Sequence, residues 1–186
     1  MLTLEGAQAG LSWLTVLKRR EGYREVFDYF DWTINMNYTD EALLEKLKDE
    51  RIIRNRLKVF SVRSNAIIFN EIVNELGSFD NYLWAFVDHK PIMNQWKTIR
   101  EVPVTTEVSD TLSRDLKKRG FKFVGSTICY AYMQAVGLVN DHISTCFCRK
   151  RQKGTKRSWY GSCLWIQFTN QCRYSLARNK YTVIKD

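Results

Sequence analysis

Apolar residues recur at helical spacing along most of the chain. The first run of leucines has separations of seven, three and three, at Leu4, Leu11, Leu14 and Leu17. This spacing keeps one helical face apolar and predicts an amphipathic helix over 4–17. Its continuation carries aromatic residues inward from Tyr23 to Phe30, is interrupted at Gly22 and ends near Asp31.

Capping residues mark the later helices. Thr39, with two carboxylates behind it, begins a short helix that runs through Leu47. A longer helix is predicted from about Asn55 to Leu76, with Gly77 at its C-terminal end, and a short one follows over 80–87. The residues of the long helix that are predicted to face inward are Leu57, Phe60, Ile67, Ile68, Ile72 and Leu76.

Similar signals define two helices joined by a tight turn. Thr106 caps the segment EVSDTLSRDLKKRG, which has basic residues in its last turn and Gly120 beyond its end. The later segment TICYAYMQAVGL is apolar nearly all round, which indicates a helix at the centre of the fold. The segment HKPIMNQWKTIREVPVTT holds both prolines and is predicted to be a surface loop. No strand pattern competes with these helices, so the predicted fold class is all-α.

Charge divides the chain into two parts. Residues 1–148 contain 19 basic and 19 acidic residues, whereas residues 149–186 contain 10 and 1. We therefore predict a folded domain at 1–148 and an unassigned basic tail at 149–186. Because the domain is neutral overall, its binding to nucleic acid would depend on a local cluster. The clearest such cluster is Lys117, Lys118, Arg119 and Lys122.

The sequence also bears on where the protein works. No apolar run reaches 18 residues, and the N-terminal stretch carries an acid where a secretory signal would carry basic residues. The five cysteines form an odd set without a disulfide framework, so we expect reduced thiols. These features predict a cytoplasmic protein.

The tight turn between the two later helices could bind a phosphate group. Gly120 and Gly125 permit a hairpin, and its backbone amides, with those of Ser126 and Thr127 at the next helix start, can face an anion. Lys122 adds counter-charge. A plain pair of helices with a solvated basic rim explains the same spacing, and both interpretations stay open at this point.

Several long segments resemble one known family. They are EGAQAGLSWLTVLKRREGYREVF, IIRNRLK, LWAFVDHKP and LSRDLKKRGFKFVGSTICYAYMQAVGLVNDH. They resemble the 3-methyladenine DNA glycosylase I family of the constitutive bacterial type, a branch of the helix-hairpin-helix glycosylase superfamily, over Leu4 to about Cys148. The resemblance implies a helix-hairpin-helix glycosylase fold and base excision repair, in which the N-glycosidic bond of N3-methyladenine in alkylated duplex DNA is hydrolysed and the base is released. The family has an N-terminal segment that this chain is expected to lack.

The resemblance also implies the site residues. Glu5 resembles the family's pocket carboxylate, with a catalytic and a base-binding role, and Trp13 resembles the aromatic residue on which the flipped base stacks. Both types suit a cationic base, which a π face attracts and a carboxylate neutralises. Spacing alone would not pair them, because eight residues on one helix leave about 80° between them. Without the resemblance, a solvated charge and a core aromatic residue would be the simpler interpretations.

The segment NDHISTC matches half of the family's structural zinc site. His142 and Cys146 have a spacing that lets two ligands on one helical turn meet one metal ion, and Cys148 offers at best a third. The other two family ligands belong to the N-terminal segment. Two ligands rarely hold zinc, so we do not expect this chain alone to bind it firmly.

Other residues leave alternatives open. Many helix-hairpin-helix glycosylases place a catalytic aspartate where Asp141 stands, although the 3-methyladenine branch is not thought to use one. We expect Asp141 to act as a cap or to orient His142, with a catalytic role as the alternative. His89 is expected in a surface loop. The alternative function is a catalytically impaired DNA-binding remnant of the family, and in either case we expect a monomer that binds duplex DNA.

Overall fold

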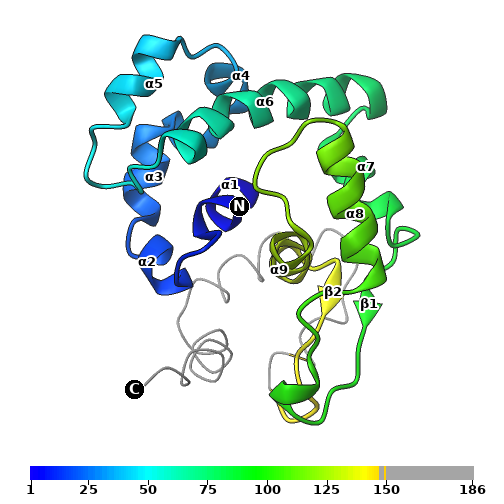
Figure 1. Ribbon diagram of the computed structural model, residues 1–186. Helices are drawn as coiled ribbons and strands as arrows, with labels where there is room; N and C mark the ends of the chain where they lie inside the picture. Colours follow the sequence, from blue (N-terminus) through cyan, green and yellow to red (C-terminus); the bar gives the residue numbers. More distant parts are fainter. Residues whose placement is uncertain (147–148, 150–186) are drawn as a thin grey trace, which may run out of the picture.

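The computed structural model describes residues 1–146 and 149. This part includes 146 of the 148 residues of the predicted domain, whereas the predicted basic tail lies outside the described residues apart from Arg149. The described part is mostly helical, as predicted, and its helices form two lobes (Figure 1). None of the helices within this part is long and apolar enough to cross a membrane.

The two lobes are consecutive in sequence and share one long helix. The first lobe contains α1 (Leu2–Gln8), α2 (Trp13–Leu17), α3 (Arg20–Val26), the 3-10 helix η1 (Asp28–Phe30), α4 (Trp32–Asn35) and α5 (Asp40–Lys46). The second contains α7 (Phe79–Ala85), β1 (Ile92–Met93), the 3-10 helix η2 (Ile99–Glu101), α8 (Glu107–Lys118), α9 (Ser126–Val136) and β2 (Val139–Asn140). Between them runs α6 (Arg56–Leu76), whose 21 residues span about 32 Å.

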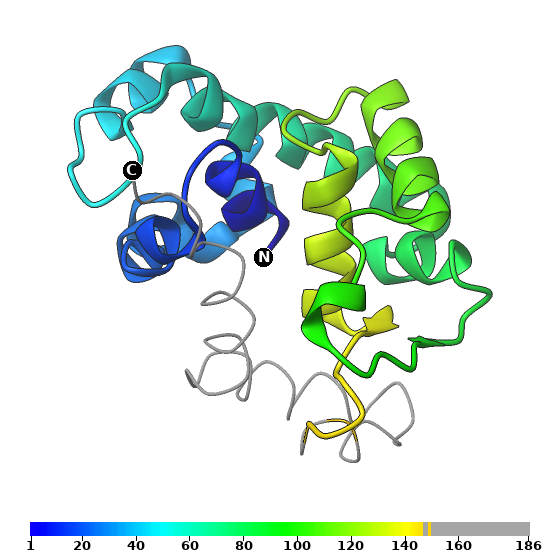
Figure 2. The same ribbon diagram turned by 60° about the horizontal axis from the view of Figure 1, so that its bottom comes forward.

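Each lobe has its own hydrophobic core, and α6 contributes to both. Val59 and Val62 of α6 belong to the core of the first lobe, and Ile72 belongs to that of the second. The turned view separates the two groups of helices, with α6 passing from one to the other (Figure 2). The long helix therefore sets the distance and orientation between the lobes.

Local capping explains where the helices begin. Thr39, Asn55 and Thr106 accept hydrogen bonds from the backbone of the first turns of α5, α6 and α8. The sequence predicted the caps Thr39 and Thr106 and a helix start near Asn55. At Thr106 the bond is reciprocated by the Ser109 side chain, which forms a capping box. Gly77 ends α6 with a φ of 77°, a conformation that costs glycine little. These predictions are confirmed.

The prediction of a single helix over 4–17 is wrong. In place of one helix over 4–17 there are two, because the chain turns between Gln8 and Trp13. Gly10 takes a φ of 75°, and Ser12 caps the new helix by accepting a hydrogen bond from Thr15 N at 3.2 Å. Gly22 does not interrupt α3 but lies within it. The spacing of seven between Leu4 and Leu11 fits a continuous helix, so the leucine pattern did not reveal the turn.

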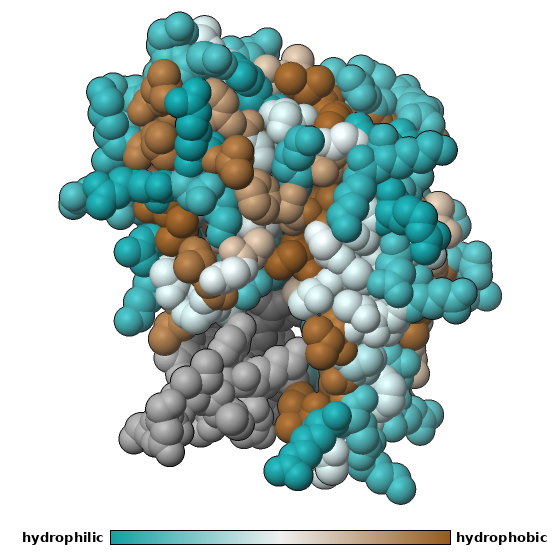
Figure 3. Space-filling view, viewed as in Figure 1, coloured by the Kyte–Doolittle hydropathy of each residue, from teal (hydrophilic) through white to brown (hydrophobic). Residues whose placement is uncertain are grey.

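Burial on α6 also departs from the prediction. Leu57, Ile67 and Leu76 are exposed, and Leu57 retains 73% of its accessible surface. On the face shown in Figure 3, apolar side chains are likewise exposed among hydrophilic ones. Helical spacing identified the correct helix but not its buried face, because that face is set by which lobes pack against it.

A short parallel strand pair was not predicted from the sequence. Ile92 pairs with Val139 and Met93 with Asn140. The predicted surface loop before α8 thus contains a strand and η2, and it is fastened to the chain just after α9. Two-residue strands have too little alternation to be read from a sequence.

Candidate active site

Glu5 lies on a helix that is shared by the two lobes. Leu4 and Ala7 of α1 belong to the core of the first lobe, while Leu2 packs against the core of the second. Figure 1 shows α1 in the middle of the described part, beside α9. Glu5 is only 2% exposed there. The structure thus rejects the interpretation of Glu5 as a solvated surface charge.

Trp13 is the first residue of α2, after the turn that ends α1. It is partly buried and packs against the core of the first lobe. Glu5 and Trp13 therefore stand on two helices, so the separation of about 80° expected on one ideal helix does not apply. The turn at Gly10 decides how the two side chains are placed relative to each other.

The predicted hairpin connects α8 to α9 at residues 119–125. Figure 1 shows α9 nearly end-on beside α8, so the two helices cross steeply. Two serines of α8 fasten the turn: Ser113 Oγ donates to Val124 O at 2.6 Å, and Ser109 Oγ is 2.8 Å from Ser126 Oγ. Gly120 and Phe123 have φ values of 102° and 58°.

The tip of the hairpin is also held by α6. Asn65 donates from Nδ2 to Lys122 O at 3.1 Å, and its Oδ1 accepts from Lys122 N at 2.8 Å. Nothing in the sequence distinguishes Asn65 from the other polar residues of α6, since its partner lies 57 positions away. The hairpin is consequently anchored on both sides.

The start of α9 carries backbone amides that no side chain of its N-cap residue binds. Gly125 is its N-cap residue, and a side chain added there would meet nothing within 4 Å. The first amides of a helix have no carbonyl partner within it and carry the positive end of its dipole. Lys122 and Thr127 are exposed beside Ser126. Gly125 and Ser126 are partly exposed, so all four predicted backbone-contacting residues are accessible to solvent.

The basic cluster is divided by the structure. Arg119 forms ion pairs with Glu75 at 2.6 Å and Asp115 at 3.0 Å, and it lies over the ring of Tyr82. Its guanidinium therefore joins α8 to α6 and contributes little positive potential. Lys117, Lys118 and Lys122 form no ion pair with any described residue.

Asp141 is buried at the centre of a hydrogen-bond network. Its four donors are Asn94 Nδ2 and Trp96 Nε1, each at 2.7 Å, Tyr130 Oη at 2.5 Å and Gln134 Nε2 at 2.6 Å. Burial, and then the bond to Asp141, raise the pKa of Tyr130. The carboxylate thus ties the loop before α8 to α9. With both oxygens engaged, it has the arrangement of a structural group rather than a free general base.

His142 and Cys146 lie together after β2. His142 Nδ1 is 3.5 Å from Cys146 Sγ, in a turn and not in the helical turn that spacing suggested. Burial lowers the pKa of His142 and so favours the neutral imidazole, while the negative charge of Asp141 acts in the opposite direction. The separation matches the distance of about 3.6 Å between nitrogen and sulfur on a tetrahedral zinc ion. Among the described residues, His142 and Cys146 belong to no group of three or more candidate metal ligands.

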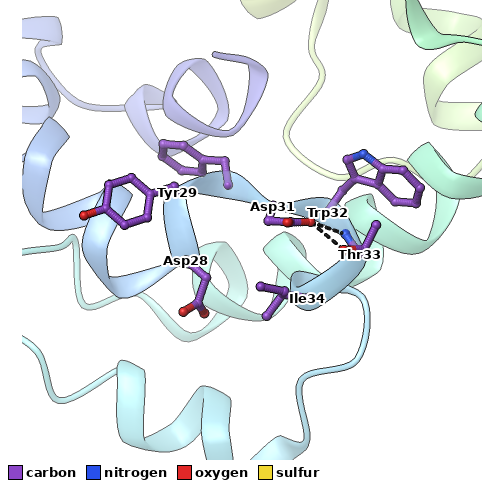
Figure 4. A pocket seen from close by; sticks show the side chains of 7 residues that line it. Asp28, Tyr29, Asp31, Trp32, Thr33 and Ile34 are labelled. Carbon is purple, nitrogen blue, oxygen red and sulfur yellow. Dashed lines mark hydrogen bonds between the residues drawn. The ribbon is translucent and has the colours of Figure 1, made fainter.

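A separate open pocket of about 770 Å³ lies at η1 and α4. Figure 4 shows Asp28, Tyr29, Asp31 and Thr33 along it. Both acids already have partners: Asp31 accepts from Thr33 Oγ1 and caps α4, while Asp28 accepts from Tyr38 and pairs with Lys46. The pocket is distant in sequence from Glu5 and the hairpin, and its acids serve the local structure.

His89 and Cys129 occupy structural positions outside the candidate site. His89 is exposed in the turn after α7, with its N–H bonded to Trp84 O at 2.9 Å. Cys129 is buried in the core of the second lobe, where burial raises the pKa of its thiol to about 11. Cys148 lies outside the described residues.

Known proteins resemble this chain in sequence. The family model described as methyladenine glycosylase matches residues 1–149, which include every described element. The DNA-3-methyladenine glycosylase 1 of Escherichia coli strain K12 is 47% identical over 148 residues, or 80% of this chain and 79% of that protein. The DNA-3-methyladenine glycosylase of Haemophilus influenzae is 45% identical over 148 residues, or 80% of each.

Solved structures agree with the sequence matches. A crystal structure of 3-methyladenine DNA glycosylase I gives a TM-score of 0.77 at 48% identity and covers 79% of this chain and 81% of that one. A tyrosine-to-phenylalanine variant of 3-methyladenine DNA glycosylase I in complex with 3-methyladenine gives 0.78 at 32% identity over 80% of each chain. The chain belongs to the methyladenine glycosylase family.

Proposed function

We propose that this chain is a monofunctional DNA glycosylase of base excision repair, which hydrolyses the N-glycosidic bond of N3-methyladenine in alkylated duplex DNA and releases the free base. Family membership supports this proposal, as does the ligand of a related solved structure, 3-methyladenine. The observation that carries it is the burial of Glu5 between the two lobes, beside the hairpin.

The chemistry follows from the charge of the damaged base. N3-methyladenine in DNA is cationic, and a carboxylate attracts a cation more strongly in a protein interior than in water. In the proposed complex the base leaves the duplex, stacks on Trp13 and is bound by Glu5. A cationic base is already a good leaving group, so the enzyme needs little acid catalysis. Water attacks the oxocarbenium-like sugar without an enzyme-bound intermediate.

The hairpin supplies the proposed contact with the DNA backbone. Amides at Gly125, Ser126 and Thr127 would bind a phosphate group, and Lys122 would add charge. Such contacts position the duplex without reading its sequence. A zinc ion held by His142 and Cys146 would be structural, and it would take no step in the proposed reaction. The proposed enzyme acts as a monomer in the cytoplasm, where bacterial chromosomal DNA lies.

The decisive experiment measures release of free 3-methyladenine from methylated duplex DNA. Glu5→Gln should lower the single-turnover rate about a hundredfold because it removes the buried charge that stabilises the transition state, with unchanged affinity for undamaged duplex. Glu71→Gln, at an exposed position of α6, is the matched control and should release base at the wild-type rate. Duplex binding by a folded chain without any release would instead establish the DNA-binding remnant.

A further inference from the structure

Lys58, in the first turns of α6, crosses to the end of α1. Its Nζ donates to Ala7 O at 2.8 Å and to Ala9 O at 2.6 Å. The same atom lies 5.9 Å from the ring centroid of Phe123 in the hairpin. One side chain thus contacts the end of the helix that carries Glu5, the turn that leads to Trp13, and the hairpin.

The end of α1 depends on this side chain. The last carbonyls of a helix have no partner within it. Gly6 O accepts from Ala9 N at 3.2 Å and Gln8 O accepts from Leu11 N at 2.7 Å. Between them, Ala7 O is bonded by Lys58, and so is Ala9 O beyond the helix. A helix of seven residues is marginal by itself, so its end and direction are set by such tertiary contacts.

The ammonium group of Lys58 is bound by backbone carbonyls and not by an acidic side chain of the described residues. The side chain is partly buried and forms no ion pair with any described residue. Burial lowers its pKa, so the ammonium is partly withdrawn from water. Its partners are the carbonyls at the negative end of the α1 dipole, which a cation stabilises. The hairpin approaches α1 at the same place, since a side chain at Gly6 would lie 3.2 Å from Phe123 Cβ.

We propose that Lys58 is a positioning residue of the glycosylase site, which holds the turn between α1 and α2 and thereby sets Glu5 relative to Trp13. The inference rests on the proposed function. Lys58 touches neither base nor sugar in this role. It acts by fixing the end of α1 and the start of the chain that leads into α2, and a displacement of about 1 Å at a reacting centre can cost about a hundredfold in rate.

The test compares Lys58→Met with a matched lysine elsewhere. Methionine keeps an unbranched apolar stem and removes the charge and the donors. Lys46→Met is the control, because Lys46 Nζ also donates to a carbonyl at a helix end, Val26 O at 2.5 Å, and pairs with Asp28, so that these partners lie in α3 and η1 and not in α1. Lys58→Arg tests rescue, since it retains both charge and donors.

Three measurements separate positioning from stability. Lys58→Met should lower the single-turnover release of 3-methyladenine about tenfold to a hundredfold at saturating enzyme, without changing the dissociation constant for undamaged duplex. Amide hydrogen exchange should increase at residues 7–13. Lys46→Met should lower the melting temperature without changing the rate, and Lys58→Arg should recover most of the rate. If Lys58→Met does not fold, Lys58→Gln replaces it with the same expectations.

Each remaining outcome contradicts the proposal. A wild-type release rate in the folded Lys58→Met variant, or a rate loss equal to that of Lys46→Met, would assign Lys58 a purely stabilising role. A rate loss that follows weakened duplex affinity would make it a DNA-binding residue. If the wild-type chain releases no base, the proposed function fails and the role of Lys58 in it fails too, which the wild-type assay distinguishes from failure of Lys58 alone.

Discussion

Asn65 in the middle of α6 binds both backbone polar groups of Lys122, accepting from its N–H at 2.8 Å and donating to its carbonyl at 3.1 Å. The two residues are 57 positions apart in the chain. Through this pair the helix that joins the two lobes also anchors the hairpin, so the proposed phosphate contact keeps a fixed position relative to α6.

Replacing Asn65 should therefore weaken DNA binding. Asn65→Ala removes both bonds and should lower the free energy of unfolding by about 1 kcal/mol, because the site is partly exposed. Affinity for undamaged duplex, measured by fluorescence anisotropy, should fall several-fold as the hairpin loosens. Asn70→Ala is a control on the same helix and should leave duplex affinity unchanged. Equal affinities of the two variants would contradict the anchoring role.

Asp141→Asn should destabilise the protein strongly. The carboxylate accepts four hydrogen bonds, and an amide in its place would direct donor hydrogens at two existing donors. We expect a loss of about 3 kcal/mol, measured by urea denaturation. Asp110→Asn, at an exposed position of α8, should change stability by less than about 0.5 kcal/mol. A stable Asp141→Asn variant that has lost excision would support the catalytic alternative instead.

The divided basic cluster predicts two kinds of effect. Lys122→Ala should reduce the salt dependence of duplex binding by about one phosphate contact, with little effect on melting temperature. Arg119→Ala should do the opposite, because it breaks the contacts with Glu75, Asp115 and the Tyr82 ring. Titrations at several salt concentrations, together with thermal melts, measure both quantities. The division is incorrect if Arg119→Ala changes the salt dependence as much as Lys122→Ala does.

Gly22→Ala should destabilise the protein although it lies in a helix. Alanine normally gains about 1 kcal/mol over glycine within a helix. Here the new Cβ would lie 2.5 Å from Arg51 Cβ and 2.7 Å from Arg51 O, so the backbone would have to move. We expect a net loss of stability, seen as a lower melting temperature. An unchanged or raised melting temperature would show that the loop at Arg51 yields easily.

Much of the helical structure could be predicted because its signals are local. Thr39, Asn55 and Thr106 cap their helices through bonds that reach three residues along the chain. The turn of the hairpin was likewise visible in the placement of Gly120 and Gly125. The family and its proposed base-binding residues were identified from the resemblance of whole segments to known proteins. This resemblance indicates the fold but does not explain it physically.

The sequence by itself determined the later helices α5 to α9, most of their caps, the hairpin and the family, but not the division of the first helix into α1 and α2. Only the tertiary structure decided that Glu5 is buried, that Arg119 is paired, and that Leu57 faces outward. It also brought four donors to Asp141 and a lysine of α6 to the end of α1. Capping bonds join residues that are neighbours in the chain. Burial and ion pairs depend on segments that are distant in the chain and come together only in the folded protein.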